Sequence, residues 1–103
     1  MHATIVRVGT GDQDISPATI VGEEMLRWLS QTEGFEGFLV LSKEGTTIGL
    51  TFWESREVAE RHRVARMQFL ERVISVVDVE LEVIEEYDVR FSQLSTLIAD
   101  FTA

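Results

Sequence analysis

The 103-residue chain contains no cysteine, no asparagine and only one proline. Without cysteine it can form no disulfide, no thiolate metal site and no cysteine nucleophile. Its two histidines, His2 and His62, are far apart in the sequence and lack the spacing of metal ligands. We therefore expect neither a metal nor another cofactor.

Long apolar runs and a basic surface are missing as well. No segment reaches the ~20 apolar residues of a membrane-spanning helix, and the first residues lack the pattern of a signal peptide. The formal net charge is −9, which argues against nucleic acid as a partner, because binding a polyanion requires concentrated positive charge. We expect a cytoplasmic protein that binds neither membrane nor nucleic acid.

The most regular pattern present lies between residues 77 and 91, where apolar and charged residues alternate. The apolar residues at odd positions are Val77, Val79, Leu81, Val83, Tyr87, Val89 and Phe91. This period of two predicts a strand with one buried side. At about 3.3 Å per residue such a strand is too long for a domain whose radius of gyration is about 13 Å. We expect it to bend or to extend onto a partner.

The remaining elements are predicted from periodicity and from signals at their ends. Strands are expected at residues 2–10, 35–42 and 47–53. One helix begins at Ser16 and ends before Gly34, and a second is capped by Ser55 and continues to about Ile74. The C-terminal tail, residues 92–103, has the spacing of a short amphipathic helix.

This order of elements predicts an α+β fold. It is the ferredoxin-like split βαβ arrangement, a four-stranded antiparallel sheet with two helices on one face, formed by residues 1–91. The strand at 35–42 is apolar on both sides, with Phe38 and Val40 on one and Leu39 and Leu41 on the other. Since two helices cover only one face, we expect a homodimer formed through the sheet face and the long last strand.

Two short motifs lie at the ends of the predicted hairpin. Gly34-Phe35-Glu36-Gly37-Phe38 opens the second strand, and Phe52-Trp53-Glu54-Ser55 closes the third before an arginine-rich helix. With these motifs the chain resembles, over residues 3–91, the antibiotic biosynthesis monooxygenase-like family of dimeric α+β barrels, which usually has proline in place of Glu33. The resemblance implies a homodimer that holds a hydrophobic or aromatic ligand between sheet and helices. The best-known members oxidise polyketide phenols without metal or flavin, or degrade haem.

The resemblance covers only part of the catalytic residues of these enzymes. The quinone-forming members are similar to this chain at Trp53, but they have Asn four residues before it and Tyr six after it, where this chain has Gly49 and Ala59. The haem-degrading members use an Asn on the first strand with a Trp and a His on the second helix. Here the corresponding helix offers only His62, near the tryptophan position, which argues against haem cleavage.

Two titratable residues are candidates for acid or base chemistry. His62 shares a helical stripe with Val58, Ala65 and Phe69, where an inward-facing imidazole can act as a general base on a phenol or enol. The alternative is a half-buried structural histidine. Glu85 lies in the apolar row of the last strand, where burial would favour an acid or base role, unless a β-bulge at Ile84-Glu85 turns it to solvent.

The other candidate residues would form the lining of a pocket. Trp53 and Trp28 are aromatic walls or, alternatively, core residues, and the small residues Gly49 and Thr51 would leave space beside the Trp53 indole. Tyr87 can supply a hydroxyl to the pocket. Among the helix arginines, Arg61, Arg63 and Arg66 can receive an anionic group at the pocket mouth or pair with the acidic residues between Asp78 and Asp88.

Three functions follow from these patterns. The first is a dimeric protein with a pocket for a hydrophobic or aromatic metabolite and no established reaction. The second is a cofactor-independent monooxygenase that oxidises an aromatic or polyketide-like phenol, with His62 as the base. The third is a structural module without a pocket.

Overall fold

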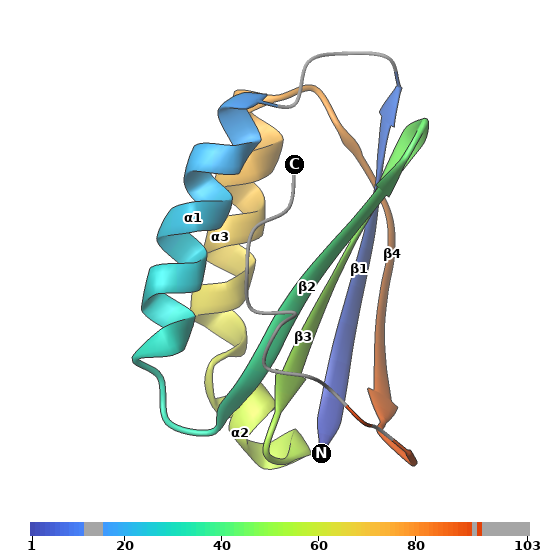
Figure 1. Ribbon diagram of the computed structural model, residues 1–103. Helices are drawn as coiled ribbons and strands as arrows, with labels where there is room; N and C mark the ends of the chain where they lie inside the picture. The colour runs from blue at the N-terminus through green and yellow to red at the C-terminus, as the bar shows by residue number, and fades with distance from the viewer. Residues whose placement is uncertain (12–15, 92, 94–103) are drawn as a thin grey trace.

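The computed structural model describes residues 1–11, 16–91 and 93. Its elements are β1 (His2–Gly11), α1 (Ser16–Ser30), β2 (Phe35–Lys43), β3 (Gly45–Trp53), α2 (Arg56–Arg61), α3 (Arg63–Val76) and β4 (Glu80–Asp88). The helices lie side by side on one face of the sheet, and none of the helices formed by the described residues covers the opposite face (Figure 1). The predicted tail, apart from Gln93, falls outside the described residues.

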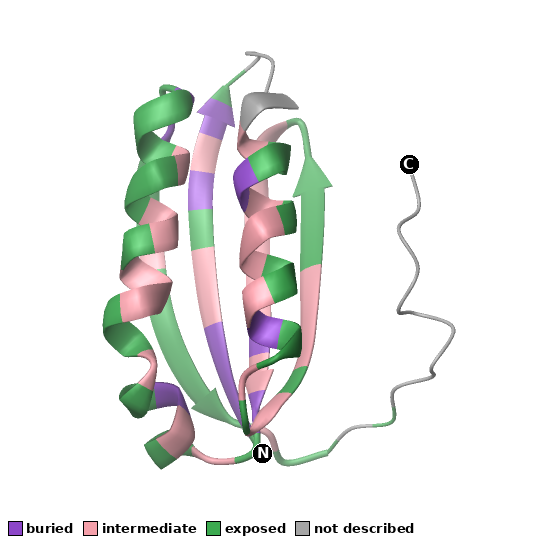
Figure 2. Cartoon of the chain, turned by 90° about the vertical axis from the view of Figure 1, so that its left-hand side faces the viewer, coloured by how far each residue is buried: buried purple, intermediate pink, exposed green. Residues whose placement is uncertain are grey.

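The sheet has the strand order β2-β3-β1-β4, with every neighbouring pair antiparallel. The two central strands are β1 and β3, while β2 and β4 form the edges. This confirms the predicted α+β, ferredoxin-like fold. Seen from the helix side, buried residues gather on the central strands and the inner helix surfaces, whereas much of the edge strands is exposed (Figure 2).

The strand register assigns each side chain to one face, because paired residues of antiparallel strands point to the same side. Thr4, Val6 and Val8 face the helices, since Arg66 of α3 contacts Thr4 and a cluster including α3 residues packs on Val8. Their partners on β3 share that side and are Thr51, Gly49 and Thr47. The opposite side, here called the open face, includes Ile5, Leu39, Leu50 and Phe52.

The last strand differs from its prediction. β4 has nine residues, and the partner of Arg7 is Val83 whereas that of Val8 is Leu81, so Glu82 is an extra residue in a bulge. A bulge reverses the alternation of faces. Val79 is therefore buried against Val8 on the helix side, while Val83 lies on the open face. The predicted single apolar row is divided between the two sides of the sheet.

The second predicted helix also differs, since it is interrupted at His62. α2 ends at Arg61 and α3 begins at Arg63, while His62 itself has φ −104° and ψ 11°. The predicted cap is confirmed, because the Val58 N–H donates to the Ser55 Oγ at 3.2 Å. The interruption lets α2 and α3 run in different directions (Figure 1), at the residue whose ring stacks on Trp53 of β3.

Gly34 occupies a turn that other residues fit poorly. Its φ is 86°, in the left-handed region, and a Cβ built on it would lie 2.5 Å from Cγ1 of Val58. Val58 cannot move aside easily because β-branched side chains are restricted at χ1. We expect Gly34→Ala to lower the free energy of unfolding by about 2–4 kcal/mol, from backbone strain and overpacking together.

Urea denaturation measures this loss, with Gly45→Ala as the matched control. Gly45 also has positive φ, at 80°, but no described residue lies within 4 Å of a Cβ built there. The control therefore isolates the backbone cost, which is about 1 kcal/mol. Equal losses for the two variants would contradict the proposed contact with Val58.

Candidate functional site

The predicted site residues fall on two sides of the sheet. Trp53, Thr51 and Gly49 of β3 face the helices, where Trp28 of α1 and Arg66 of α3 belong to the same interior. Five predicted pocket residues thus share one side, together with His62. The other two, Tyr87 and Glu85, lie on the open face of β4. They do not line the space between the sheet and the helices.

Trp53 is the centre of the interior group. Its side chain is 0 % exposed, at the end of β3 that lies beside α2 (Figure 1). The His62 ring stacks on the indole, with ring centres 5.6 Å apart and an angle of 21° between the planes. Phe35 packs edge-on against the indole at 6.1 Å. Trp53 therefore joins the sheet to the α2–α3 junction, as a core residue does.

His62 lies between two tryptophans. Besides stacking on Trp53, it meets the Trp28 ring edge-on at 5.9 Å, and Trp28 in turn packs against Phe69 of α3 at 5.6 Å. The side chain is half-buried, so the predicted inward orientation is confirmed. Among the described residues its ring nitrogens have no hydrogen-bond partner, which leaves them available to a ligand.

Arg66 reaches from α3 to the sheet. Its Nη1 donates to the Thr4 Oγ1 at 3.2 Å, and its Nη2 donates to the Ala59 carbonyl at 2.7 Å. The guanidinium lies over the Trp53 ring, 5.6 Å from its centre, which is a cation–π contact. Burial lowers the pKa of Arg66 from its ordinary value, opposed in part by the charges of Glu86 and Glu60. The group remains a cation at neutral pH.

Gly49 borders open space on the helix side of β3. A Cβ built on it meets no described residue within 4 Å. Val40, the partner of Gly49 on β2, faces the same side and is 52 % exposed. The space beside Gly49 is therefore open to solvent at the β2 edge of the sheet.

Three residues at this end of the sheet form contacts that the sequence did not predict as part of a site. His2 is buried, and its Nε2 lies 3.1 Å from Oε1 of Glu86, while Thr4 is the hydroxyl that Arg66 contacts. The side chains of His2 and Thr4 lie on the helix-facing side of β1, and their register partners on β3 are Trp53 and Thr51. Polar residues in alternation at the start of a central strand are the signal that could have identified them.

The open face carries a separate polar pair. The Tyr87 hydroxyl donates to the Glu85 Oε2 at 2.5 Å. This hydrogen bond raises the pKa of Tyr87, with smaller contributions from desolvation and from the negative charge of Glu85. Glu85 is exposed, so of the two alternatives from the sequence, burial is wrong for the single chain and exposure to solvent is observed. The bulge in β4 lies at Glu82, whereas the second alternative had placed it at Ile84-Glu85.

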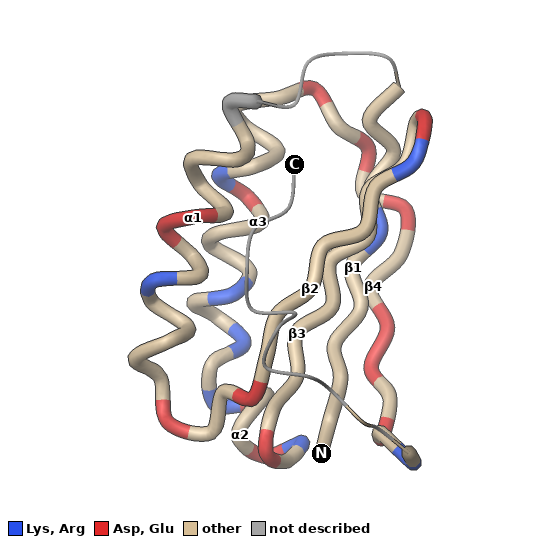
Figure 3. Tube along the Cα trace, viewed as in Figure 1, with Lys and Arg blue, Asp and Glu red and all other residues tan. Residues whose placement is uncertain are grey.

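Charged residues are distributed unevenly over the fold. Acidic residues follow β4, and basic residues lie on α2 and α3 (Figure 3). Arg72 pairs with Glu24 of α1 at 2.6 Å, and Arg63 lies 3.9 Å from Glu60. The arginine-rich segment thus makes part of its ion pairs with α1 and α2. Exposed pairs of this kind stabilise by about 0–1 kcal/mol each.

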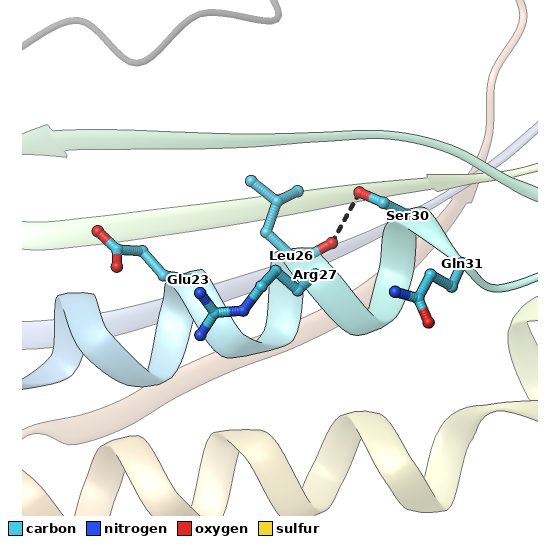
Figure 4. A pocket seen from close by; sticks show the side chains of 5 residues that line it. All are labelled: Glu23, Leu26, Arg27, Ser30 and Gln31. Carbon is cyan, nitrogen blue, oxygen red and sulfur yellow. Dashed lines mark hydrogen bonds between the residues drawn. The ribbon is translucent and has the colours of Figure 1, made fainter.

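A depression of about 440 Å³ lies elsewhere, along the C-terminal half of α1. Its lining residues are Glu23, Leu26, Arg27, Ser30 and Gln31. Within it the Ser30 hydroxyl donates to the Leu26 carbonyl (Figure 4). None of the predicted site residues takes part in it.

Two further searches of the described residues bear on function. Across residues 1–11, 16–91 and 93, no group of three or more His, Asp or Glu side chains is placed to hold a metal ion. Within the same ranges, no helix has the length and apolar content needed to cross a membrane.

Comparison with solved structures identifies known proteins with the same fold. A candidate antibiotic biosynthesis monooxygenase from Deinococcus radiodurans superposes with a TM-score of 0.71 at 15% identity, covering 93% of this chain and 99% of that one. SnoaB, a cofactor-independent oxygenase from Streptomyces nogalater, superposes with a TM-score of 0.66 at 16% identity, covering 88% and 95%. A candidate antibiotic biosynthesis monooxygenase from Nitrosomonas europaea gives a TM-score of 0.67 at 13% identity, covering 88% and 100%.

No sequence profile of a known family matches the chain, and no curated protein sequence matches it. At 11–16% identity, structural likeness establishes the fold alone. At that level the predicted resemblance to antibiotic biosynthesis monooxygenases is confirmed.

Proposed function

We propose that this chain is a cytoplasmic, homodimeric α+β barrel protein that binds a hydrophobic or aromatic metabolite between its sheet and its helices. The observation that carries this proposal is the space beside Gly49. Gly49 lies on the same strand and the same side as Trp53, with Thr51 between them. The space beside Gly49 opens to solvent past the apolar side chain of Val40. Apolar walls with a few polar groups are typical of small-molecule sites.

The open face supports the homodimer. It carries apolar side chains on all four strands, interrupted by the charged residues Arg7 and Glu85. The apolar residues are Ala3, Ile5, Leu39, Leu41, Ile48, Leu50, Phe52, Val83 and Tyr87. Leu41 and Tyr87 are 49 % and 48 % exposed. A largely apolar surface of this kind marks an interaction site, and a second copy offers a surface of the same shape and character.

Filling the space beside Gly49 tests ligand binding. In the series Gly49→Ala, Gly49→Val and Gly49→Leu, we expect affinity for a neutral aromatic probe, naphthamide, to fall stepwise. The leucine variant should lose at least about tenfold, since an overlapping side chain excludes the ring. Stability should hold, because β-branched and larger residues suit a strand better than glycine. Changes in the amide NMR spectrum on titration measure the affinity.

The matched control is Gln68→Leu, which places the same leucine side chain on an exposed part of α3, away from both Gly49 and the open face. Gln68→Leu should bind naphthamide as the native chain does. A native protein that does not bind the probe, or a Gly49→Leu variant that binds it equally well, would contradict a pocket at this place.

A second candidate function is cofactor-independent oxygenation of a phenol or related enol. The observation that favours it is His62, whose free ring nitrogens lie between two tryptophans on the inner side of the sheet. A base that removes a proton from an electron-rich ring prepares that ring to transfer an electron to dioxygen. The chain's lack of asparagine separates it from the quinone-forming enzymes that it resembles, so binding is the leading proposal.

A further inference from the structure

Three buried polar nitrogens at the end of the sheet beside α2 have no hydrogen-bond partner among the described residues. They are Nε1 of Trp53, Nε of Arg66 and Nδ1 of His2. The groups that carry them are neighbours. The Arg66 guanidinium lies over the Trp53 ring, and His2 is the register partner of Trp53 on β1.

Unpartnered nitrogens of this kind are rare in folded proteins. More than nine in ten buried polar groups have a hydrogen-bond partner, because an unmade bond leaves the group without its water and without a replacement. Trp53 and His2 are 0 % and 3 % exposed, so bulk water does not supply that partner. Since the indole and the guanidinium can only donate, the missing group is an acceptor.

The charge of Arg66 specifies the acceptor further. Its two hydrogen bonds go to neutral oxygens, the Thr4 hydroxyl and the Ala59 carbonyl, and no described carboxylate lies within ion-pair distance of it. Cations withdrawn from water are normally paired with an anion. Arg66 is half-buried, and the charges of Glu86 and Glu60 act on it from beyond ion-pair distance. Its guanidinium therefore has no direct anionic partner among the described residues.

We infer that Arg66 and Trp53 form a binding point for an anionic oxygen of the ligand, a carboxylate or an enolate, so that the ligand is an aromatic or hydrophobic acid. This inference rests on the proposed function, because the acid must enter between the sheet and the helices. Thr51 lies between Gly49 and Trp53 on the same side of β3. Neighbouring residues on one side of a strand are about 7 Å apart. An aromatic ring beside Gly49 can thus direct a carboxylate towards Arg66.

Glu86 does not occupy this position. Its Oε1 lies against His2 Nε2 at 3.1 Å. The third nitrogen, His2 Nδ1, can donate or accept according to the tautomer of the ring. A buried water is the other occupant that fits the donors, and it would leave the cation unpaired.

The test compares two probes of the same shape on the native protein, naphthoate and the neutral naphthamide. We expect naphthoate to bind at least about tenfold more tightly, because charge-assisted hydrogen bonds are stronger than neutral ones. The chain has two tryptophans, so its NMR spectrum contains two indole N–H resonances, which a Trp28→Phe variant assigns. The Trp53 resonance should move downfield when naphthoate binds, and it should move less when naphthamide binds.

Arg66 variants localise the effect. Arg66→Gln should reduce naphthoate affinity at least about tenfold and leave naphthamide affinity unchanged, and Arg66→Lys should fall between, because an ammonium keeps the charge without the planar set of donors. The matched control is Arg72→Gln. It removes the same charge from α3 at a residue that pairs with Glu24 of α1, and it should change neither affinity.

The outcomes separate the two proposals. Equal affinities of the native protein for both probes, or a naphthoate affinity that does not depend on Arg66, would overturn the anion site and leave the pocket standing. Binding of neither probe would overturn both and leave water as the occupant of these donors. The comparison of probes on the native chain needs no variant, so it decides the matter even if the Arg66→Gln protein folds poorly.

Discussion

Replacing Leu50 with arginine is expected to convert the protein from a dimer to a monomer. Leu50 lies on the open face of the central strand β3, with Ile5 of β1 and Leu39 of β2 as its register partners. In a face-to-face dimer an arginine here would be buried without a counter-charge, which costs several kcal/mol. Because a twofold interface contains the same residue from both subunits, it would carry the substituted arginine twice. Sedimentation velocity at micromolar concentration measures the result.

The matched control is Val64→Arg. Val64 is an apolar residue of α3 that is 72 % exposed, so an arginine there remains in water and the dimer should persist. Circular dichroism should show both variants folded, because each changed side chain lies outside the two core clusters. A native chain that sediments as a monomer would rule out the proposed dimer and with it the role of the open face.

The second large effect concerns His62 and tests oxygenation. We expect the native protein to consume oxygen with an anthrone-type phenol and His62→Ala to do so about 10²–10⁴-fold more slowly, which is the usual contribution of a general base. In this reaction a ring methylene becomes a carbonyl. One atom of dioxygen enters the quinone, and the other leaves as water with the two hydrogens of the methylene. An oxygen electrode records the rate.

Two companion variants separate chemistry from structure. His62→Gln keeps much of the side-chain volume between the tryptophans but cannot take up a proton, so it should be as slow as His62→Ala. Gln68→Ala, on an exposed part of α3, should react at the native rate. No uptake by the native protein, or equal uptake by His62→Ala, would remove the oxygenase candidate and leave the binding proposal untouched.

The sequence determined the class of the fold through local rules. The alternation of apolar residues located the strands, and the turn at Gly45 and the cap at Ser55 marked where elements begin and end. The order of elements then allowed few topologies, because split βαβ connections place both helices on one face. The sequence also predicted that His62 faces inward, but from a continuous helix that the structure interrupts at this residue. Its position against Trp53 therefore depends on the junction between α2 and α3 as well as on helical periodicity.

The composition of the site could be predicted only in part. Trp53, Thr51 and Gly49 share a face because alternate residues of one strand always do. His2 was missed as a site residue because its register partner Trp53 and its hydrogen-bond partner Glu86 lie on other strands and are brought near it by the strand register. No local pattern in β1 specifies that register.

Tertiary structure alone decided where the alternation in the last strand reverses. Period two predicts one continuous face from Val77 to Phe91, but the bulge at Glu82 places Val79 under the helices and Val83 on the opposite side. The position of a bulge depends on how β4 fits its neighbour β1 and the core around Val8, so it is a property of packing. For the same reason Glu85 and Tyr87, which the sequence placed in the pocket, belong to the open face, while the unpartnered donors of Trp53 and Arg66 arise only where three distant segments meet.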